Sequence, residues 1–158
     1  HTEARPALFE ASAARLVQEA ELGHEVFGPS TVLIRCASPE EMAQVVRRME
    51  GTLTATIHGT PEDLKTYRGV IRLLEEKAGR LLINGYPTGV EVCAAMHHGG
   101  PYPATSDSKF TSVGTAAILR SARPVCYQNF PQDLLPIELR DENERKIWRL
   151  VDGKFSNE

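Results

Sequence analysis

The fold is decided by residues 31–51, which read TVLIRCASPEEMAQVVRRMEG. The first six residues form a continuous, partly β-branched apolar run, the pattern of a strand that is buried on both faces. Ser38 then supplies a helix N-cap, with proline at the next position and a glutamate three residues after the cap. Apolar residues follow at helical spacing, namely Met42, Val45, Val46 and Met49. The stretch therefore predicts a buried strand and then an amphipathic helix that ends at Gly51.

The same unit recurs immediately afterwards. Residues 53–58 (LTATIH) have the pattern of a second strand, and the segment TPED at 60–63 repeats the cap chemistry. One helix is predicted from that cap to Gly79, and a third strand at residues 81–83. A β-α-β-α-β order implies parallel strands that are joined by right-handed crossovers. The predicted fold class is therefore α/β, with an open, mostly parallel sheet and flanking helices.

Shorter elements are expected on both sides of this core. A long loop rich in Gly and Pro occupies residues 84–111, and such a loop is usually functional or forms an interface. The other expected elements are strands at 7–9 and 123–130 and helices at 12–22, 111–119 and 143–151. Because no internal linker divides the chain, we expect residues 1–158 to belong to one domain.

The composition argues against several classes of protein. The chain has 158 residues, with 18 basic and 21 acidic groups and a net charge of −3, so no nucleic-acid partner is expected. No run of 18 apolar residues is present, which argues against a membrane partner. The three cysteines include no C-x-x-C pair, so we expect neither a disulfide framework nor a zinc knuckle. This use of cysteine predicts a cytoplasmic location. Because the chain begins with His1 rather than Met, we expect it to be a piece of a longer protein.

Charge is unevenly distributed along the chain. Residues 81–139, which we call the charge-poor segment, contain seven charged residues among 59, about half of the 25% found in the whole chain. A small domain cannot hide so long a segment in its own core. Much of it is therefore expected to face a missing domain, a sister subunit or a ligand. A well-packed internal loop is the alternative.

The loop that begins Gly85-Tyr86-Pro87-Thr88-Gly89 is a candidate ligand site. In open parallel sheets, ligands gather beyond the carboxyl ends of the strands, and the third strand is expected to end at Asn84. This reasoning favours a small-molecule contact in the loop. A structural connector that is shaped by its Gly and Pro residues remains equally open.

Other candidate chemistry is weaker. His97 and His98 suggest a metal, but no H-E-x-x-H or Cys/His cluster supports them, so hydrogen-bonded loop histidines are favoured and no metal is expected. Cys93 and His97 would share a helix face as a thiol–imidazole pair, although the apolar neighbours favour a packed cysteine, and Cys126 has the same interpretation. The Gly-rich coenzyme fingerprint, the phosphate loop and the nucleophile elbow are all absent from the sequence.

Glu25 and Phe27 form a small constellation before the turn at Gly28-Pro29. A carboxylate can accept two hydrogen bonds from a ribose diol, and an aromatic ring can lie beside another flat ring. On these two residues alone, the signal for a nucleotide site is weak.

Several motifs together resemble the aldehyde dehydrogenase superfamily over almost the whole chain. The segment EVFGP at 25–29 resembles the E-x-F-G-P motif of that superfamily. Four further segments resemble the branch that contains α-ketoglutaric semialdehyde (2,5-dioxovalerate) dehydrogenases and related NADP-dependent enzymes. They are GRLLINGYPTGVEV at 79–92, HGGPYPATS at 98–106, TSVG at 111–114 and RPVCYQ at 123–128.

The resemblance implies the carboxy-terminal part of an NAD(P)-dependent aldehyde dehydrogenase catalytic domain. In that family, the glutamate matching Glu25 binds the nicotinamide ribose, and the phenylalanine matching Phe27 packs beside the nicotinamide. The loop matching Pro87, Thr88 and Gly89 borders the aldehyde tunnel. The strand matching residues 123–130 joins the sheet of a homo-oligomer.

The resemblance also implies that the reaction needs more than this chain. The family's nucleophilic cysteine, its general-base glutamate and its coenzyme-binding domain lie upstream of E-x-F-G-P, and the 24 residues that precede Glu25 include no cysteine. In the family reaction, the cysteine attacks an aldehyde to give a thiohemiacetal, hydride leaves to NAD or NADP, and water releases the acid from a thioester. The chain by itself is therefore expected to be inactive. The rival interpretation is a non-catalytic α/β binding or assembly domain.

Overall fold

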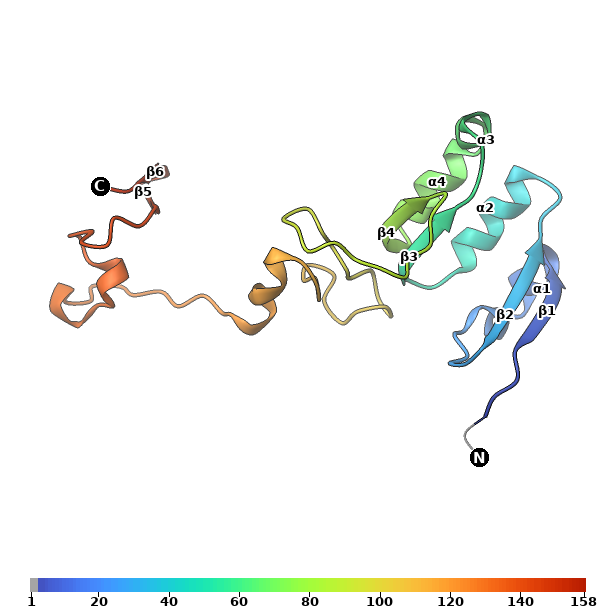
Figure 1. Cartoon of the computed structure of the whole chain (residues 1–158), viewed down its shortest axis with the longest axis horizontal. Coiled ribbons are helices and arrows are strands. Elements are labelled where there is room, and N and C mark those ends of the chain that lie inside the picture. Colours follow the sequence, from blue (N-terminus) through green and yellow to red (C-terminus); the bar gives the residue numbers. More distant parts are fainter. Residues whose placement is uncertain (1–2) are drawn as a thin grey trace. The chain divides into compact units, whose positions relative to one another are not determined.

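The structure is a computed structural model that describes residues 3–158. It divides into two compact units, His1–Ala122 and Arg123–Glu158, which are described separately. The first unit contains strands and helices of the predicted α/β class (Figure 1). The strand predicted to be buried on both faces is wrong in its burial, because Val32 and Leu33 of the strand at Ser30–Arg35 are exposed. No helix within residues 3–158 is long and apolar enough to cross a membrane.

The first strand pair is parallel. Strand β1 (Ala7–Ser12) pairs with β2 (Ser30–Arg35), and helix α1 (Ala13–Gln18) and the short helix η1 (Ala20–Gly23) connect them. Ser12 caps α1, because its hydroxyl accepts a hydrogen bond from the backbone N–H of Arg15. The early strand and helix predicted from the sequence are thus present, with a longer strand than expected.

The second strand pair is also parallel. Helix α2 (Pro39–Arg48) leads into β3 (Thr52–Ile57), and β4 (Ala78–Ile83) pairs with β3. The Ser38 hydroxyl caps α2 by accepting from the backbone N–H of Glu41, as its sequence position predicts.

The predicted second helix is wrong in two details. It is divided into α3 (Pro61–Thr66) and α4 (Arg68–Glu75), because the backbone leaves helical geometry at Tyr67. Gly79 does not end this helix; it lies inside β4, where the chain of residues 99–100 passes too close for a side chain. A glycine after an apolar helical stripe is therefore not always a helix stop.

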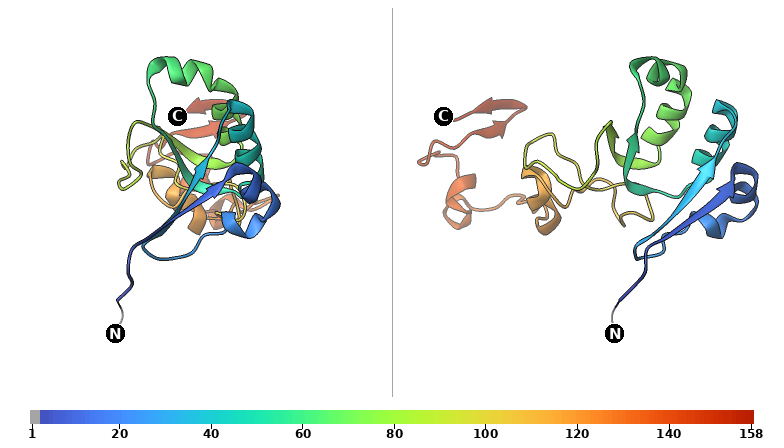
Figure 2. Two further views of the ribbon diagram at one scale, coloured as in Figure 1. Left: turned by 90° about the vertical axis from the view of Figure 1, so that its right-hand side faces the viewer. Right: turned by 45° about the vertical axis from the view of Figure 1, so that its right-hand side comes forward.

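The predicted single open sheet is present as two separate two-stranded sheets, β1–β2 and β3–β4. Helix α2 contacts both α1 and α4, so the three helices pack in one continuous row (Figures 1 and 2). The strands, in contrast, form two separate hydrogen-bonded pairs. Consecutive strands of a β-α-β unit are often, but not always, neighbours. The sequence pattern predicts parallel direction, and it does not decide whether β2 and β3 share hydrogen bonds.

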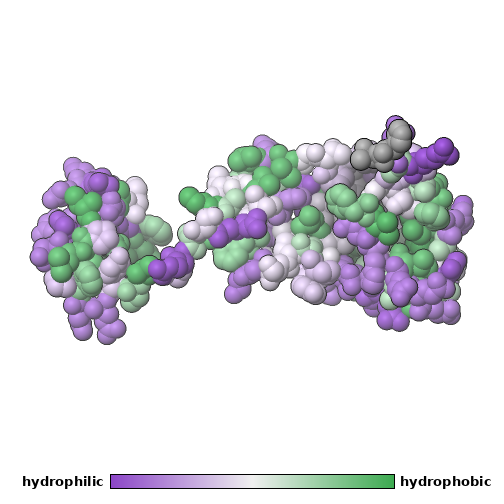
Figure 3. Space-filling model, turned by 90° about the horizontal axis from the view of Figure 1, so that it is seen from below, coloured by the Kyte–Doolittle hydropathy of each residue, from purple (hydrophilic) through white to green (hydrophobic). Residues whose placement is uncertain are grey.

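The hydrophobic core is small. Ala13, Leu16 and Val45 are buried together, and Ile34 and Cys36 of the β2 region pack against them. No large side chain within the described residues is fully buried. Apolar residues instead remain on the surface of both units, as the hydrophobic colouring of Figure 3 shows. Such exposure is typical of surfaces that pack against another polypeptide.

The long loop after β4 has no helix or strand until η2 (Thr115–Ser121), a 3-10 helix near the predicted helix at 111–119. Two large side chains of this loop are largely exposed, Tyr86 by 77% and Tyr102 by 82%, and Ile118 of η2 is exposed by 72%. Gly99, Gly100 and Thr111 of the same loop are buried, so the loop is packed in one part and exposed in others. The exposed side chains fit the expectation that the charge-poor segment faces another surface.

The second unit differs most from the prediction. The strand predicted at residues 123–130 is absent, because a strand needs a hydrogen-bonded partner and none in residues 3–158 pairs with them. The terminal helix predicted at 143–151 is wrong, since β5 (Arg149–Val151) and β6 (Lys154–Ser156) form an antiparallel hairpin. Asp152 and Gly153 between them have φ values of 51° and 77°, which a two-residue hairpin turn requires. The short 3-10 helices are η3 (Gln132–Leu134) and η4 (Ile137–Leu139).

Candidate functional site

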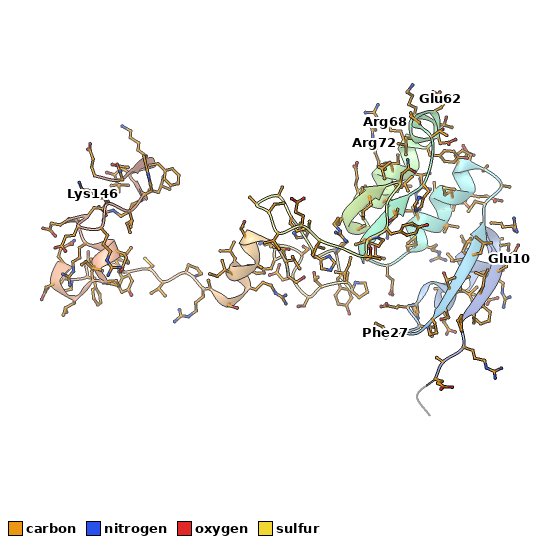
Figure 4. The ribbon with its side chains drawn as sticks, viewed as in Figure 1. Glu10, Phe27, Glu62, Arg68, Arg72 and Lys146 are labelled. Carbon is orange, nitrogen blue, oxygen red and sulfur yellow. The ribbon has the colours of Figure 1, made fainter. Side chains whose placement is uncertain are left out.

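Glu25 and Phe27 lie in the loop between η1 and β2, at the amino end of β2. This loop and the neighbouring strands line a groove of about 800 Å³. Its lining residues are Phe9, Leu22 and 24–32. The Phe27 side chain is 97% exposed at the end of the first strand pair (Figure 4). A bare aromatic ring at a groove is well suited to lie against another flat ring.

The Glu25 carboxylate is exposed and makes no hydrogen bond or ion pair with any residue in 3–158. A carboxylate in this state keeps all its acceptor positions for a ligand, such as the two hydroxyls of a diol. Glu25 and Phe27 therefore present a free acceptor and a free apolar face from the same loop.

A second hollow places Glu25 beside residues that are distant in the sequence. This hollow, of about 540 Å³, is lined by Glu25, by residues 49–54 around the amino end of β3, and by Pro103 and Ala104. The sequence interpretation did not bring these groups together. They extend the candidate site from one motif to three segments of the chain.

Close backbone packing explains why residues 99–104 reach this edge. A Cβ on Gly79 would overlap the carbonyl group of Gly99, and a Cβ on Gly51 would overlap the carbonyl oxygen of Pro101. Gly100 in turn packs on the backbone of Thr52. Only residues without a side chain allow such an approach, so the glycines fix the loop against β3 and β4. They are the signal from which this contact could have been predicted.

Thr111 secures the same loop from the other side. It is only 3% exposed, and its hydroxyl accepts from the backbone N–H of His98 at 2.7 Å and donates to the carbonyl of Val113 at 2.6 Å. Ser112 donates to the carbonyl of His98 from both its backbone and its hydroxyl. The HGGPYP segment is therefore held by hydrogen bonds as well as by glycine packing.

The Pro87–Gly89 loop lies elsewhere. It follows the carboxyl end of β4, whereas Glu25 shares a hollow with the amino end of β3. Because β3 and β4 are parallel, the two candidate segments lie toward opposite ends of this strand pair. The structure thus does not join them into one pocket. Arg80 of β4 donates hydrogen bonds to the carbonyl oxygens of Gly89 at 2.8 Å and Pro87 at 3.2 Å.

The sequence interpretation also missed a contact at the loop that contains Glu25. His24 Nε2 lies 3.7 Å from Glu50 Oε1, and both side chains are more than half exposed. This pair joins the residue before Glu25 to the end of the α2 region. Such an exposed pair contributes little to stability, but it links two of the three segments of the site.

The three cysteines lie in different surroundings. Burial raises the pKa of the Cys36 thiol, and the Glu41 carboxylate raises it further, so the unreactive thiol form is favoured near neutral pH. Cys93 is half-buried and makes no hydrogen bond to His97, and Cys126 is exposed. Within residues 3–158, no group of three or more His, Cys, Asp or Glu side chains is arranged to hold a metal ion.

Comparison with known proteins gives close relatives. No family profile matches the chain. It is 53% identical over 148 residues, 94% of its length, to α-ketoglutaric semialdehyde dehydrogenase 2 of Azospirillum brasilense. It is 50% identical over 153 residues, 96% of its length, to α-ketoglutaric semialdehyde dehydrogenase of Acinetobacter baylyi. The chain spans only 28% and 29% of the length of these two relatives.

Proposed function

The chain belongs to the aldehyde dehydrogenase superfamily, and we propose that it is the carboxy-terminal part of the catalytic domain of an NAD(P)-dependent aldehyde dehydrogenase. The observation that carries this proposal is identity of 50–53% over almost the whole chain to two such enzymes. The parent protein oxidises an aldehyde to the carboxylic acid. Because both relatives are named for α-ketoglutaric semialdehyde, that compound is the proposed substrate.

Glu25 and Phe27 are the proposed contacts to the nicotinamide end of the coenzyme. The exposed, unpaired carboxylate of Glu25 fits a ribose diol, and the bare ring of Phe27 fits the face of a flat heterocycle. When bound, NAD or NADP accepts the hydride that leaves the aldehyde carbon. The role of this chain is to orient the coenzyme, which contributes to rate by positioning.

The nucleophile of the proposed reaction lies outside this chain. Attack on the aldehyde needs a thiolate, and the burial and raised pKa of Cys36 disfavour one. Cys93 lies half-buried with no base hydrogen-bonded to it within the described residues. We therefore assign neither the nucleophile nor the general base to residues 1–158, and the isolated chain is proposed to be inactive.

The remaining assignments follow from the same proposal. Pro87, Thr88 and Gly89 border the aldehyde tunnel, with the rest of the tunnel supplied by other parts of the parent protein. Residues 123–130 pair with a strand of another subunit in a homo-oligomer. The enzyme is proposed to work in the cytoplasm, without a membrane or nucleic-acid partner.

The rival function is a non-catalytic α/β binding or assembly domain that has kept the fold. Trapping of the covalent intermediate separates the two possibilities. The full-length protein is mixed with the aldehyde and coenzyme, quenched in acid, digested, and searched by mass spectrometry for an acylated cysteine. The proposal predicts one acylated cysteine at a position upstream of this chain. Acylation of Cys36, Cys93 or Cys126 would refute the assignment. If no cysteine becomes acylated in the presence of aldehyde and coenzyme, the rival function is favoured.

A further inference from the structure

Residues 85–92, which we call the β4 exit segment, are weakly attached to the rest of the first unit. They contain no helix or strand, and from Tyr86 onward every residue of the segment is exposed. Within the described chain, their backbone N–H groups make no hydrogen bond to any other residue. One ring contact, between Tyr86 and His58 at 5.3 Å, holds the beginning of the segment. A segment with so few contacts is expected to open easily.

Arg80 provides the only hydrogen bonds that any side chain in residues 3–158 makes to this segment. Its Nη1 donates to the carbonyl oxygen of Gly89 at 2.8 Å, and its Nη2 donates to that of Pro87 at 3.2 Å. The two acceptors flank Thr88, so one side chain ties both ends of the turn. Arg80 itself is half-buried on β4, in register with Thr54 of β3. The anchor is therefore built on a paired strand.

The chemistry of arginine suits this task. The guanidinium is planar and keeps its charge, and its N–H groups form a fork of fixed geometry, so two carbonyls can be bound at a set spacing. A lysine has one ammonium group on a flexible stem and would reach one carbonyl at a time. Arg80 makes no ion pair with another residue of 3–158. Its Nη1 and Nη2 donate to the turn, whereas its buried Nε has no partner within the described residues.

We propose that Arg80 is a positioning residue for the aldehyde site, which it controls by fixing the Pro87-Thr88-Gly89 turn. This inference rests on the proposed function for its substrate, because that turn is the proposed border of the aldehyde tunnel. Arg80 acts through the turn and does not touch the reacting atoms. Loss of the fork frees Thr88 and its neighbours and lowers the affinity for the aldehyde, while the coenzyme contacts at Glu25 and Phe27 are unaffected.

The anchor itself is tested by proteolysis, independently of any activity. The chain and its Arg80→Met and Arg80→Lys variants are treated with a glutamate-specific protease, and mass spectrometry follows cleavage after Glu91 in the β4 exit segment. Cleavage after Glu21, an exposed residue of η1, is the internal reference. The matched control is Arg72→Met, because Arg72 is an exposed arginine of α4 that forms no hydrogen bond within the described residues (Figure 4).

The inference predicts that Arg80→Met speeds cleavage after Glu91 by about tenfold relative to Glu21, because opening of the segment becomes easier. Arg80→Lys should lie between the wild type and Arg80→Met, and Arg72→Met should match the wild type. Equal cleavage rates at Glu91 in all four proteins would overturn the anchor. A parallel rise at Glu91 and Glu21 would mean general destabilisation and would also overturn it.

The substrate role is tested with the full-length enzyme. Arg80→Met should raise the KM for the aldehyde by about tenfold, because misplacement of a positioning group by about 1 Å can have effects of this size or larger. The kcat and the Kd for coenzyme should stay within about twofold of the wild type. An unchanged aldehyde KM, or an equal change in aldehyde KM and coenzyme Kd, contradicts the inference. If the full-length wild type oxidises no aldehyde, the proposed function fails and the substrate role of Arg80 fails with it, while the proteolysis still decides the anchor.

Discussion

Single residues carry the functional interpretation, and Glu25 is the most direct of them. Its carboxylate is free, and it lines both hollows at the amino end of the strand pairs. The structure adds neighbours that the sequence motif did not indicate, namely residues 49–54, Pro103 and Ala104. Glu25 is therefore placed where three segments meet, which is typical of a ligand site.

The charge of Glu25 should matter for coenzyme binding rather than for folding. In the full-length protein, Glu25→Gln keeps the shape but weakens acceptance of hydrogen bonds from a diol, so the Kd for NAD or NADP should rise by about tenfold. A fluorescence titration with each coenzyme measures the effect. Glu21→Gln, a nearby exposed glutamate of η1, should leave the Kd unchanged. Equal coenzyme affinity in wild type and Glu25→Gln would contradict the assignment.

Gly79 tests the packing that brings the loop to the site. A methyl group at this position overlaps the backbone of Gly99 and Gly100, so Gly79→Ala should destabilise the chain by about 1–3 kcal/mol. The midpoint of urea unfolding, followed by circular dichroism, reports the change. Gly69→Ala is the matched control, because a Cβ there meets no atom within 4 Å and alanine favours the helix α4. Loss of stability in the control alone would contradict the packing.

At the scale of elements, local signals were predictive and long-range ones were not. Ser38 and Thr60 were identified as caps because capping depends on neighbours three residues away. Whether β2 pairs with β3 depends on contacts that no local pattern encodes. The hairpin of residues 149–156 has a local signal in Asp152-Gly153, but the spacing of apolar residues around Trp148 predicts a helix there, and the strand pairing contradicts it. Similarly, the segment EVFGP at 25–29 is recognisable in the sequence, but nothing in it indicates that Glu25 and Pro103 line the same hollow.

The capping box of α3 predicts a pH dependence. Hydrogen bonds from the Thr60 hydroxyl and then from its backbone N–H, at 2.7 and 2.8 Å, lower the pKa of Asp63. Asp63 therefore binds a proton more readily in the unfolded chain than in the folded one. Its stabilising effect is complete above the unfolded pKa of about 4 and is lost as the pH falls through the lower folded value.

Thermal unfolding of the chain and of Asp63→Asn at several pH values measures this effect. The midpoint of the wild type should exceed that of the variant by a constant amount above about pH 5, and the difference should shrink below about pH 4. Glu62 is an exposed neighbour on the same helix and does not belong to the capping box. The difference in midpoint between wild type and Glu62→Gln should therefore not shrink in this way below about pH 4. A difference that grows on acidification would contradict the sign of the pKa shift.

At the scale of the whole molecule, the chain exposes many large apolar side chains of the kind that pack against other polypeptide. Its buried hydrophobic core is limited to small clusters, and large apolar side chains such as Phe27, Tyr102 and Phe155 remain exposed. The charge-poor segment contributes many of them. The length of the chain is consistent with this exposure, since the chain spans only 28% and 29% of the length of its two relatives. This surface agrees with our proposal that the chain supplies contacts to the coenzyme and the aldehyde, and that the rest of the parent protein supplies the bond-making groups.

The most direct test is a side-by-side assay of the full-length parent protein and the 158-residue chain. Each is mixed with α-ketoglutarate semialdehyde and with NAD or NADP, and formation of the reduced coenzyme is followed by its absorbance. We predict formation of one reduced coenzyme and one carboxylic acid per aldehyde by the full-length protein, and no formation by the chain alone. Turnover by the isolated chain, or none by the full-length protein with either coenzyme, would contradict the account.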